Sequence, residues 1–442
     1  MRTGWLTGGR GRCRSLRGPA AVAGSVLVVV VLAVGCGSVT PAAGPSKPAS
    51  RSAAAPTATS MPSASPSPPS AAEQAAEAVQ GPAAVPTSAQ LAALRSLASV
   101  IATMSPAQLA GQRVIYSFSG TSAPASLLTA IQQGEAGGVI LFTDNITSPA
   151  QLTSLIAQLT AANASPQNPA RQYPLLVMTD QEGGEVKRLP WAGPDESEAQ
   201  IGASADPAAA AAAAGAQAAA GLSAVGLNVD LAPVLDVYRQ AGDFDDQYQR
   251  SYSMNPAVVA AAGAAFIRAL QAGGVAATVK HFPGLGAAGA GQDTDDEPVE
   301  IDLSASTLRS VDEAPYQAAI QAGVQLAMVS WATYPALDSR QLPAGLSPTI
   351  IQGELQQRLG FSGVTITDAL GAGALAGYGS LQNRTMLAAR AGMDALLCTG
   401  TGALPGPECL AGLEGGYLDG ALPVTAFKAQ LAQLLALRSD LG

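Results

Sequence analysis

Short apolar segments recur along the chain, and a longer stretch of helix-forming residues separates each one from the next. Continuously apolar strands that alternate with helices are typical of a parallel sheet covered on both faces. Eight such units predict an α/β fold, a single closed (β/α)8 TIM barrel, more readily than an open sheet. The predicted strands are Arg113–Phe118, Gly138–Phe142, Leu175–Thr179, Leu227–Ala232, Ala277–His281, Leu326–Ser330, Gly363–Thr367 and Ala395–Cys398.

The stretches between these segments predict the outer helices of the barrel. The alanine-rich stretch is interpreted as a barrel helix and not as low-complexity sequence, because alanine is the strongest helix former. The clearest examples are Pro149–Ala162, Pro207–Gly221, Pro256–Ala272, Ser306–Ala322 and Pro348–Leu359. A helical pattern of leucines also begins at about Ser88. We therefore expect the barrel domain to span residues 88–442.

The N-terminal residues have the pattern of an export signal. Several arginines precede an apolar run from Ala20 to Val34, which is too short for an ordinary membrane span. Small residues then lead to Cys36, so residues 1–35 are interpreted as a lipoprotein signal peptide and Cys36 as the lipidated residue. An ordinary signal peptide and an uncleaved anchor are the alternatives. Residues 36–87 are rich in Pro, Ser, Ala and Thr, which predicts a disordered linker.

The chain carries a formal net charge of −9, and only 12% of its residues are charged. No basic patch is present to bind a polyanion, so nucleic acid is not an expected partner. Cleavage of the signal peptide would remove arginines and no acidic residue, so only lipid could hold the protein to an anionic membrane. We expect an exported monomer that is lipid-anchored to the outer face of the bacterial cytoplasmic membrane.

Polar residues are concentrated where the predicted strands end. Charged residues are rare in this chain, so their repeated placement at these ends is unlikely to be accidental. The active sites of barrel enzymes lie at the carboxyl ends of the strands, which makes these residues candidates for the chemistry. They are Asp180, Glu182, Asp236, Lys280, His281 and Asp368.

Five motifs around these positions resemble glycoside hydrolase family 3, in particular its single-barrel β-N-acetylglucosaminidase branch. They are Asp180–Leu189, Asn228–Val237, Arg250–Tyr252, Lys280–Gly284 and Gly363–Leu370. They occur in the family's order and cover about residues 90 to 400. The resemblance implies a glycosidase that removes a terminal β-linked N-acetylhexosamine from glycans or cell-wall fragments. It implies a carbohydrate substrate and no cofactor.

One part of the chain departs from this pattern. The branch normally has a second histidine after Pro-Gly, and then an Asp-Ser-His sequence whose histidine and aspartate form the general acid/base dyad. Here the turn reads Pro283–Gly286 and the loop beyond it Gly291–Pro298. His281 is the only histidine of the whole chain and occupies the sugar-binding position, so no such dyad can form. Trp331 also replaces a usual histidine, and Glu185 a usual arginine.

Asp368 is the expected nucleophile, because retaining hydrolysis needs a carboxylate on one side of the sugar and a proton donor on the other. The alternative is an aspartate that caps the next helix. Glu182 and Asp236 are interpreted as partners that orient the cations of the site. The residues expected to bind sugar hydroxyls are Asp180, Arg188, Arg250, Lys280 and His281. A structural ion-pair network at the barrel mouth is the alternative for this set.

The proton donor is the open assignment. Asp293 and Asp295 lie in the loop that replaces the dyad, and Asp295 aligns with the missing histidine. A carboxylic acid can donate the proton if burial or a like-charged neighbour raises its pKa. A solvated acidic loop is the alternative. A carboxylate in this role would repel phosphate, so water or a sugar hydroxyl is the expected acceptor.

Two further cysteines, Cys398 and Cys409, form either a disulfide or two separate buried apolar side chains. No metal site is expected, because the chain has one histidine and no EF-hand pattern. The missing dyad supports a second hypothesis for the whole chain, a carbohydrate-binding lipoprotein with impaired catalysis. A two-lobed transport receptor fits the single series of eight strands less well.

Overall fold

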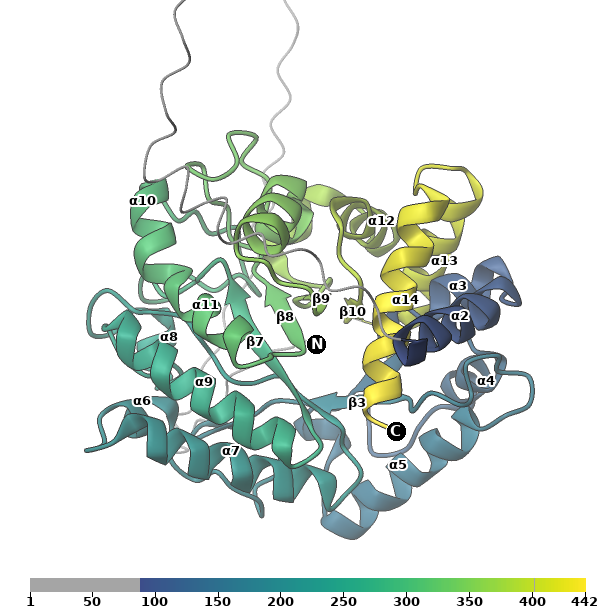
Figure 1. The fold of residues 1–442 in the computed structure, drawn as a ribbon, viewed down its shortest axis with the longest axis horizontal. Helices are drawn as coiled ribbons and strands as arrows, with labels where there is room; N and C mark the ends of the chain where they lie inside the picture. The colour runs from purple at the N-terminus through teal and green to yellow at the C-terminus, as the bar shows by residue number, and fades with distance from the viewer. Residues whose placement is uncertain (1–87, 401) are drawn as a thin grey trace, which may run out of the picture. The chain divides into compact units, whose positions relative to one another are not determined.

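Eight parallel strands form the centre of the computed structural model, which describes residues 88–400 and 402–442. Around the barrel they follow in the order β10 (Leu396–Cys398), β1 (Val114–Tyr116), β2 (Gly138–Ile140), β3 (Leu176–Thr179), β6 (Val229–Asp230), β7 (Ala276–Phe282), β8 (Leu326–Val329) and β9 (Val364–Thr367). A parallel bridge between Ile366 and Ala395 connects β9 to β10 and closes the ring. Each strand overlaps one of the predicted segments, so the (β/α)8 barrel is confirmed (Figure 1).

Helices surround these strands on the outside. Helices α5 (Pro149–Asn163), α7 (Pro207–Ser223) and α9 (Pro256–Ala272) follow the predicted stretches closely. The alanine-rich segment is therefore a regular barrel helix. Its small side chains let α7 approach α9 closely, and a Cβ on Gly215 would come within 2.5 Å of the Phe266 carbonyl oxygen.

Two predicted helices differ from expectation. The stretch from Ser306 to Ala322 is broken into α10 (Ala305–Thr307), a wide π-type turn and α11 (Ala314–Gln321). The break precedes Pro315, which has no amide hydrogen to continue the helical bonding. The stretch near Pro348 forms a π-type helix at Thr349–Arg358. Proline is tolerated at the start of a helix, so its presence did not indicate a break. The spacing of the apolar residues alone did not reveal these irregular turns either.

The first and last helices complete the outer ring. Figure 1 shows α13 and α14, in yellow, beside α2 and α3, in blue. The bounds of these and the remaining helices are α2 (Ser88–Ala102), α3 (Pro106–Gly111), α4 (Ala125–Gln133), α6 (Glu198–Gly202), α8 (Phe244–Gln247), α12 (Leu381–Ala391), α13 (Gly406–Leu418) and α14 (Val424–Asp440). Helices from the two ends of the described residues, which are far apart in sequence, thus lie side by side in the outer ring.

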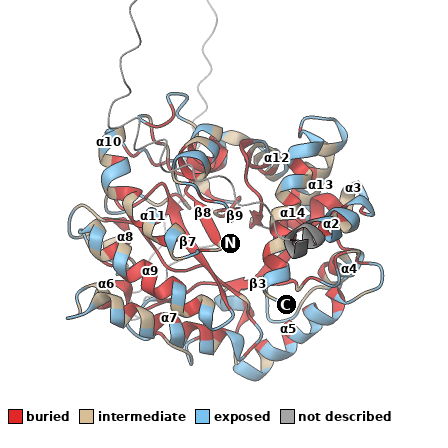
Figure 2. Ribbon diagram, in the orientation of Figure 1, coloured by how far each residue is buried: buried red, intermediate tan, exposed pale blue. Residues whose placement is uncertain are grey.

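Alternating side chains of each strand fill two separate cores. Ile115, for example, points into the barrel, whereas its neighbours Val114 and Tyr116 pack against the helices. Figure 2 shows the strands as buried and the outer faces of α5, α7 and α9 as exposed. Leu434 and Leu437 of α14 join the inner core. They belong to the helix that covers the amino-terminal end of the barrel, which leaves the carboxyl end for the chemistry.

The predicted signal peptide, the lipidation site Cys36 and the linker 36–87 lie outside the described residues. Within the described part, no helix combines the length and the apolar character that a membrane crossing requires.

Cys398 and Cys409 are joined by a disulfide, with their Cα atoms 6.2 Å apart. The bond links the end of β10 to the first turns of α13, and both cysteines are fully buried. Of the two interpretations of these cysteines, the structure therefore has the disulfide. Because Leu397 lines the candidate site, the bond also fixes the strand end next to it.

We expect the double variant Cys398→Ala/Cys409→Ala to lose about 2–3 kcal/mol of unfolding free energy, since the bond closes a short loop in the unfolded chain. Urea denaturation of wild type and variant measures the loss, and wild type treated with a reductant is the control. Peptide mapping of the unreduced protein should recover the two cysteines in one linked fragment. Two free thiols in that map would contradict the prediction.

Candidate active site

A pocket opens at the carboxyl ends of the barrel strands. Leu231, Met328 and Leu397 of the inner barrel core contribute apolar lining. Nine polar side chains that the sequence singled out line the same pocket: Asp180, Glu182, Arg188, Arg250, Lys280, His281, Asp293, Asp295 and Asp368. The structure thus brings together residues from five separate motifs.

Lys280 of β7 is the most buried cation of the pocket. Its ammonium group lies 2.8 Å from Asp180 Oδ1 and 2.7 Å from Glu182 Oε1. Burial would lower the pKa of Lys280, but Asp180 and Glu182 hold it above its ordinary value. Lys280 is therefore charged and fixed in place, with both carboxylates held at the side of the pocket.

Glu182 also binds the guanidinium of Arg250 through two parallel hydrogen bonds of 2.9 Å each. Burial would raise the pKa of Glu182, but Arg250 and Lys280 together lower it to about 2. Arg188 lies at a longer distance, with its Nε 3.8 Å from Asp180 Oδ2. These contacts agree with the predicted role of Glu182, which orients the cations of the site.

The hairpin that presents Glu182 was not predicted. Strands β4 (Gln181–Gly183) and β5 (Val186–Lys187) form a separate antiparallel pair directly after β3. Gln181 stabilises it, since its side chain accepts from the Leu189 amide and donates to backbone carbonyls beyond. The pair of glycines at the turn was the available sequence signal, because Gly183 and Gly184 both have positive φ.

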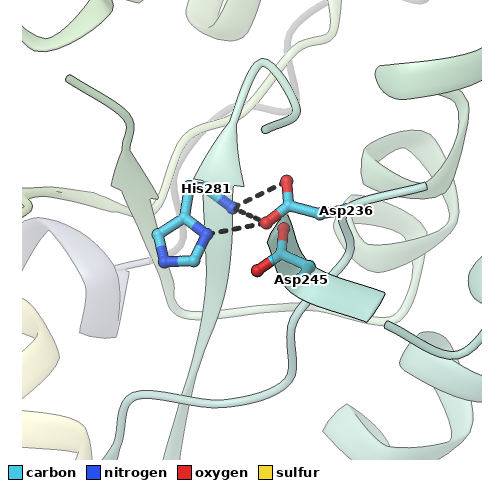
Figure 3. Close-up of side chains that lie close together, drawn as sticks. All are labelled: Asp236, Asp245 and His281. Atoms are coloured by element: carbon cyan, nitrogen blue, oxygen red, sulfur yellow. Dashed lines mark hydrogen bonds and ion pairs between the residues drawn. The ribbon is translucent and has the colours of Figure 1, made fainter. Parts of the chain in front are cut away.

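His281 is held by Asp236, as Figure 3 shows. The ring Nδ1 lies 2.7 Å from Asp236 Oδ2, and the Asp236 carboxylate also accepts from the backbone amides of His281 and Leu285. Burial and Arg250 lower the pKa of His281 to about 4. The prediction that Asp236 orients a cation is thus refined: its partner is a neutral ring that donates from Nδ1 and keeps Nε2 as an acceptor.

Asp245 of α8 completes this cluster and was missed by the sequence reasoning. It is fully buried, lies 3.5 Å from Arg250 Nη1, and its pKa rises to about 7 through burial and the charge of Asp236. Asp236, Asp245 and His281 form the one group in the described part of the chain that places three ligand atoms within 4.8 Å of one another. However, His281 Nδ1 already forms a hydrogen bond with Asp236, and the Arg250 guanidinium lies beside Asp245. These contacts already engage the cluster, so it does not fit a cation well.

Two further buried carboxyl groups lie beneath the pocket and were also missed. Burial raises the pKa of Asp230 to about 8, and burial together with Glu182 raises the pKa of Glu198 well above its usual range. Each accepts one backbone amide bond, from Gln181 and Val234 respectively. Both carboxyl groups are therefore mainly neutral near pH 7. The cations of the pocket pair with Asp180 and Glu182 instead. For Asp230 the signal in the sequence was a lone acidic residue between Val229 and Leu231, whereas Glu198 lies in a stretch with other acidic residues that gave no such signal.

Asp368 follows β9 and stands at the pocket surface. Its Oδ1 accepts the amide of Ala369 at 2.7 Å, and the carbonyl of Ala369 accepts the indole N–H of Trp331 at 2.9 Å. Trp331 is fully buried against Gly345, where a Cβ would lie 2.4 Å from the indole ring. Trp331 thus fixes the residue that orients the Asp368 carboxylate. No helix follows Asp368 directly, so the capping alternative does not describe its position.

The acidic loop is fixed against the loop that follows β9. The amide of Gly373 donates to the Asp295 carbonyl at 2.7 Å, and that of Ala374 to the Thr294 carbonyl at 3.1 Å. Asp293 Oδ1 accepts the amide of Asp295 at 2.8 Å, which closes a tight turn. These bonds argue against a loosely solvated loop.

The carboxyl group of Asp295 has no hydrogen-bond partner within the described residues and lines the pocket with Asp368. Burial raises its pKa well above the usual range, and the charges of Asp368 and Asp293 raise it further. Burial also raises the pKa of Asp293, more modestly. Of the two loop candidates, Asp295 has the environment that a proton donor needs.

Comparisons with known proteins identify the family of the chain. The model of the glycosyl hydrolase family 3 N-terminal domain matches residues 107–437. A protein of Arthroderma benhamiae described as an uncharacterized secreted glycosyl hydrolase is 44% identical over 318 residues, which are 72% of this chain and 88% of that protein. A β-hexosaminidase of Stenotrophomonas maltophilia is 36% identical over 275 residues, 60% of this chain and 77% of that protein.

Solved structures give the same result. A family 3 β-N-acetylglucosaminidase from Paenibacillus superposes with a TM-score of 0.71 and 31% identity over 77% of this chain, which spans 63% of that one. A β-N-acetylhexosaminidase from Beutenbergia cavernae gives a TM-score of 0.69 and 29% identity, over 76% of this chain and 99% of that one.

We expect Trp331→Phe to lower kcat/KM for an aryl β-N-acetylglucosaminide roughly tenfold, because one hydrogen bond that positions Ala369 and Asp368 is lost. The inhibition constant of N-acetylglucosamine should change by less than about twofold, since the cations of the pocket are untouched. Trp191→Phe is the matched control, because Trp191 is exposed. Equal losses in the two variants would show that Trp331 does not position Asp368.

Proposed function

The chain belongs to glycosyl hydrolase family 3, and we propose that it hydrolyses terminal β-linked N-acetylhexosamine with retention of configuration. The observation that carries the proposal is that Asp368 and the partly buried carboxyl group of Asp295, which has no hydrogen-bond partner within the described residues, line one pocket. Retaining hydrolysis requires one ionised and one protonated carboxyl group on opposite sides of the glycosidic bond. The N-acetylhexosamine specificity follows the names of the relatives described above.

In the first step, the Asp368 carboxylate attacks the anomeric carbon and forms a glycosyl ester. The glycosidic bond breaks, and its electron pair stays on the leaving oxygen, which takes the proton of Asp295. In the second step, water attacks the anomeric carbon, Asp295 accepts its proton, and Asp368 departs as a carboxylate. The raised pKa of Asp295 keeps the donor protonated at the start of this cycle.

The fixed ion pairs supply sugar recognition in this proposal. Lys280, Arg250 and Arg188 are held by carboxylates at one side of the pocket, so their remaining N–H groups point in set directions. Asp180 and the neutral Nε2 of His281 offer acceptors for sugar hydroxyl groups. Donors and acceptors that are preorganised in this way orient a pyranose without a rearrangement of the protein.

A second candidate function is a carbohydrate receptor that has lost turnover, and the absence of a second histidine favours it. Such a receptor would need the ion-pair network but not the contacts that orient Asp368. The bond from Trp331 to Ala369 and the anchoring of the Asp295 loop favour the enzyme.

We also propose that the protein is exported and held to the outer face of the cytoplasmic membrane by lipid on Cys36, as a monomer. A similar protein is described as secreted, which supports export. The buried disulfide supports an oxidising compartment.

Asp368→Asn should abolish hydrolysis of both an activated aryl glycoside and an unactivated disaccharide, because both need the nucleophile. Asp295→Asn should lower kcat/KM for the disaccharide by about two to four orders of magnitude and spare kcat/KM for the aryl substrate, whose leaving group needs little acid. Its kcat on the aryl substrate should fall, because the second step loses the base that activates water. Azide should rescue Asp295→Asn and give a glycosyl azide of retained configuration. Asp293→Asn is the matched control without azide rescue. Sugar binding without any hydrolysis in wild type would identify the receptor.

The pH profile of kcat/KM for the disaccharide should extend to higher pH than an ordinary carboxylic acid would allow. Asp295 acts in its protonated form, and burial with the charge of Asp368 raises its pKa, so activity is lost only as pH rises through that raised value. The alkaline limb should be absent for Asp295→Asn acting on the aryl substrate. An alkaline limb that is identical in both proteins would assign it to another group.

A further inference from the structure

A short segment, residues 369–374, links the backbone of Asp368 to the loop that carries Asp295. At its start, the Ala369 amide donates to Asp368 Oδ1 at 2.7 Å. Near its end, the Gly373 amide donates to the Asp295 carbonyl at 2.7 Å, and a Cβ on Gly373 would lie 2.9 Å from that same oxygen. The conformation of this segment therefore affects how far the two carboxyl groups lie from each other.

The side chain of Arg384 holds the middle of this segment. Its Nη1 donates to the carbonyls of Leu370 and Ala372 at 3.1 and 3.4 Å. Its Nε donates to the Gly379 carbonyl at 3.0 Å, just before the helix that carries the arginine. The guanidinium is charged and planar, so its N–H groups contact the three carbonyls in a fixed arrangement. Arg384 thus ties the segment after Asp368 to the start of α12.

The local needs of α12 do not explain an arginine at this position. The helix begins at Leu381, and the start of a helix carries a partial positive charge that disfavours a cation. Arg384 also forms no ion pair with a carboxylate within the described residues. The helix start itself is well anchored, because the Ser380 hydroxyl accepts the Asn383 amide at 3.3 Å and the Asn383 side chain donates to the Tyr378 carbonyl at 2.8 Å. The contacts with the loop carbonyls therefore account for the arginine.

We infer that Arg384 is a positioning residue that sets the separation between the Asp368 and Asp295 carboxyl groups. Within the described residues no hydrogen bond or ion pair joins Arg384 to either group, so it acts through the backbone of residues 369–374. Retaining hydrolysis needs its two carboxyl groups about 5 Å apart, which makes their separation a quantity that the fold must control. The inference rests on the proposed function, because it assigns the nucleophile and the proton donor to these two residues.

The pH profile reports this separation. The charge of Asp368 is one cause of the raised pKa of Asp295, and its effect weakens with distance. Asp295 acts as the acid in its protonated form, so activity on an unactivated disaccharide is lost as pH rises through its pKa. If the two groups move apart, that pKa falls and the alkaline limb moves to lower pH. A variant that is merely less stable keeps the limb of the wild type.

The test uses the full protein with Arg384→Met, which removes the donors and keeps an unbranched side chain that suits a helix. We expect kcat/KM for a disaccharide of β-linked N-acetylglucosamine to fall roughly thirtyfold, and its alkaline limb to move to lower pH by about half a pH unit. For an activated aryl β-N-acetylglucosaminide the loss should be only about threefold, because this substrate needs little acid. The inhibition constant of N-acetylglucosamine should change by less than about twofold.

Two further variants complete the comparison. Arg384→Lys keeps a cation that can reach carbonyl oxygens but lacks the planar fork of arginine, so it should place the alkaline limb between those of wild type and Arg384→Met. Arg390→Met is the matched control, because Arg390 is exposed in the last turn of the same helix. The control should keep the wild-type limb and change kcat/KM for both substrates by less than about twofold. Urea denaturation of each variant gives its stability separately from these activities.

The results that would overturn the inference are distinguishable. If Arg384→Met loses both substrates equally and keeps the wild-type limb, Arg384 has a structural role only, and the proposed function stands. If the wild type cleaves neither substrate, the proposed function fails and the inference fails with it. Should Arg384→Met not fold, Arg384→Gln takes its place, since its amide can still donate to one carbonyl. A wild-type limb in that variant would equally refute the inference, and a limb at lower pH would support it.

Discussion

The ammonium group of Lys280 lies between Asp180 and Glu182 in the dry interior of the barrel mouth, and the arrangement of the pocket depends on this contact. Loss of one partner from such a buried pair leaves an uncompensated charge, which costs about 3–5 kcal/mol. Arg250 is tied to the same Glu182, so a single carboxylate sets the positions of two cations. Burial raises the pKa values of the neighbouring carboxyl groups of Asp230 and Glu198, so these two groups are mainly neutral. Burial and the positions of the two cations thus determine which acids are ionised here.

The fold could be predicted from the sequence because its signals are local and repeated. Eight apolar segments of strand length, separated by helix-forming stretches, are enough to indicate a barrel, and the topology then places their polar ends together. Asp180 and Asp368 could be brought into one site in this way although 188 positions separate them in the chain. The π-type turns near Pro315 and Thr349 could not be predicted, since wide and regular helices share the same apolar spacing.

The parts of the site that were not predicted depend on burial, which cannot be deduced from the sequence pattern. Asp245, Asp230 and Glu198 looked like ordinary acidic residues, but burial and neighbouring carboxylates raise their pKa values. The same holds for His281, whose neutral state follows from burial and from Arg250. The two alternatives for the acidic loop could also not be separated before its backbone bonds to Gly373 and Ala374 were known. Residue types were therefore predictable at this site, but protonation states were not.

In the proposed mechanism, the use of Asp295 in place of a histidine-based donor has a chemical consequence for the catalytic cycle. The charge of Asp368 is one of the causes that raise the pKa of Asp295, so the free enzyme keeps its acid protonated. When Asp368 becomes part of a glycosyl ester, that charge disappears, and the pKa of Asp295 must fall. Asp295 has then just lost its proton to the leaving oxygen and remains ionised as the base for the incoming water. Because the nucleophile itself sets the proton affinity of its partner, a second carboxylate can serve as acid and then as base without any movement of the loop.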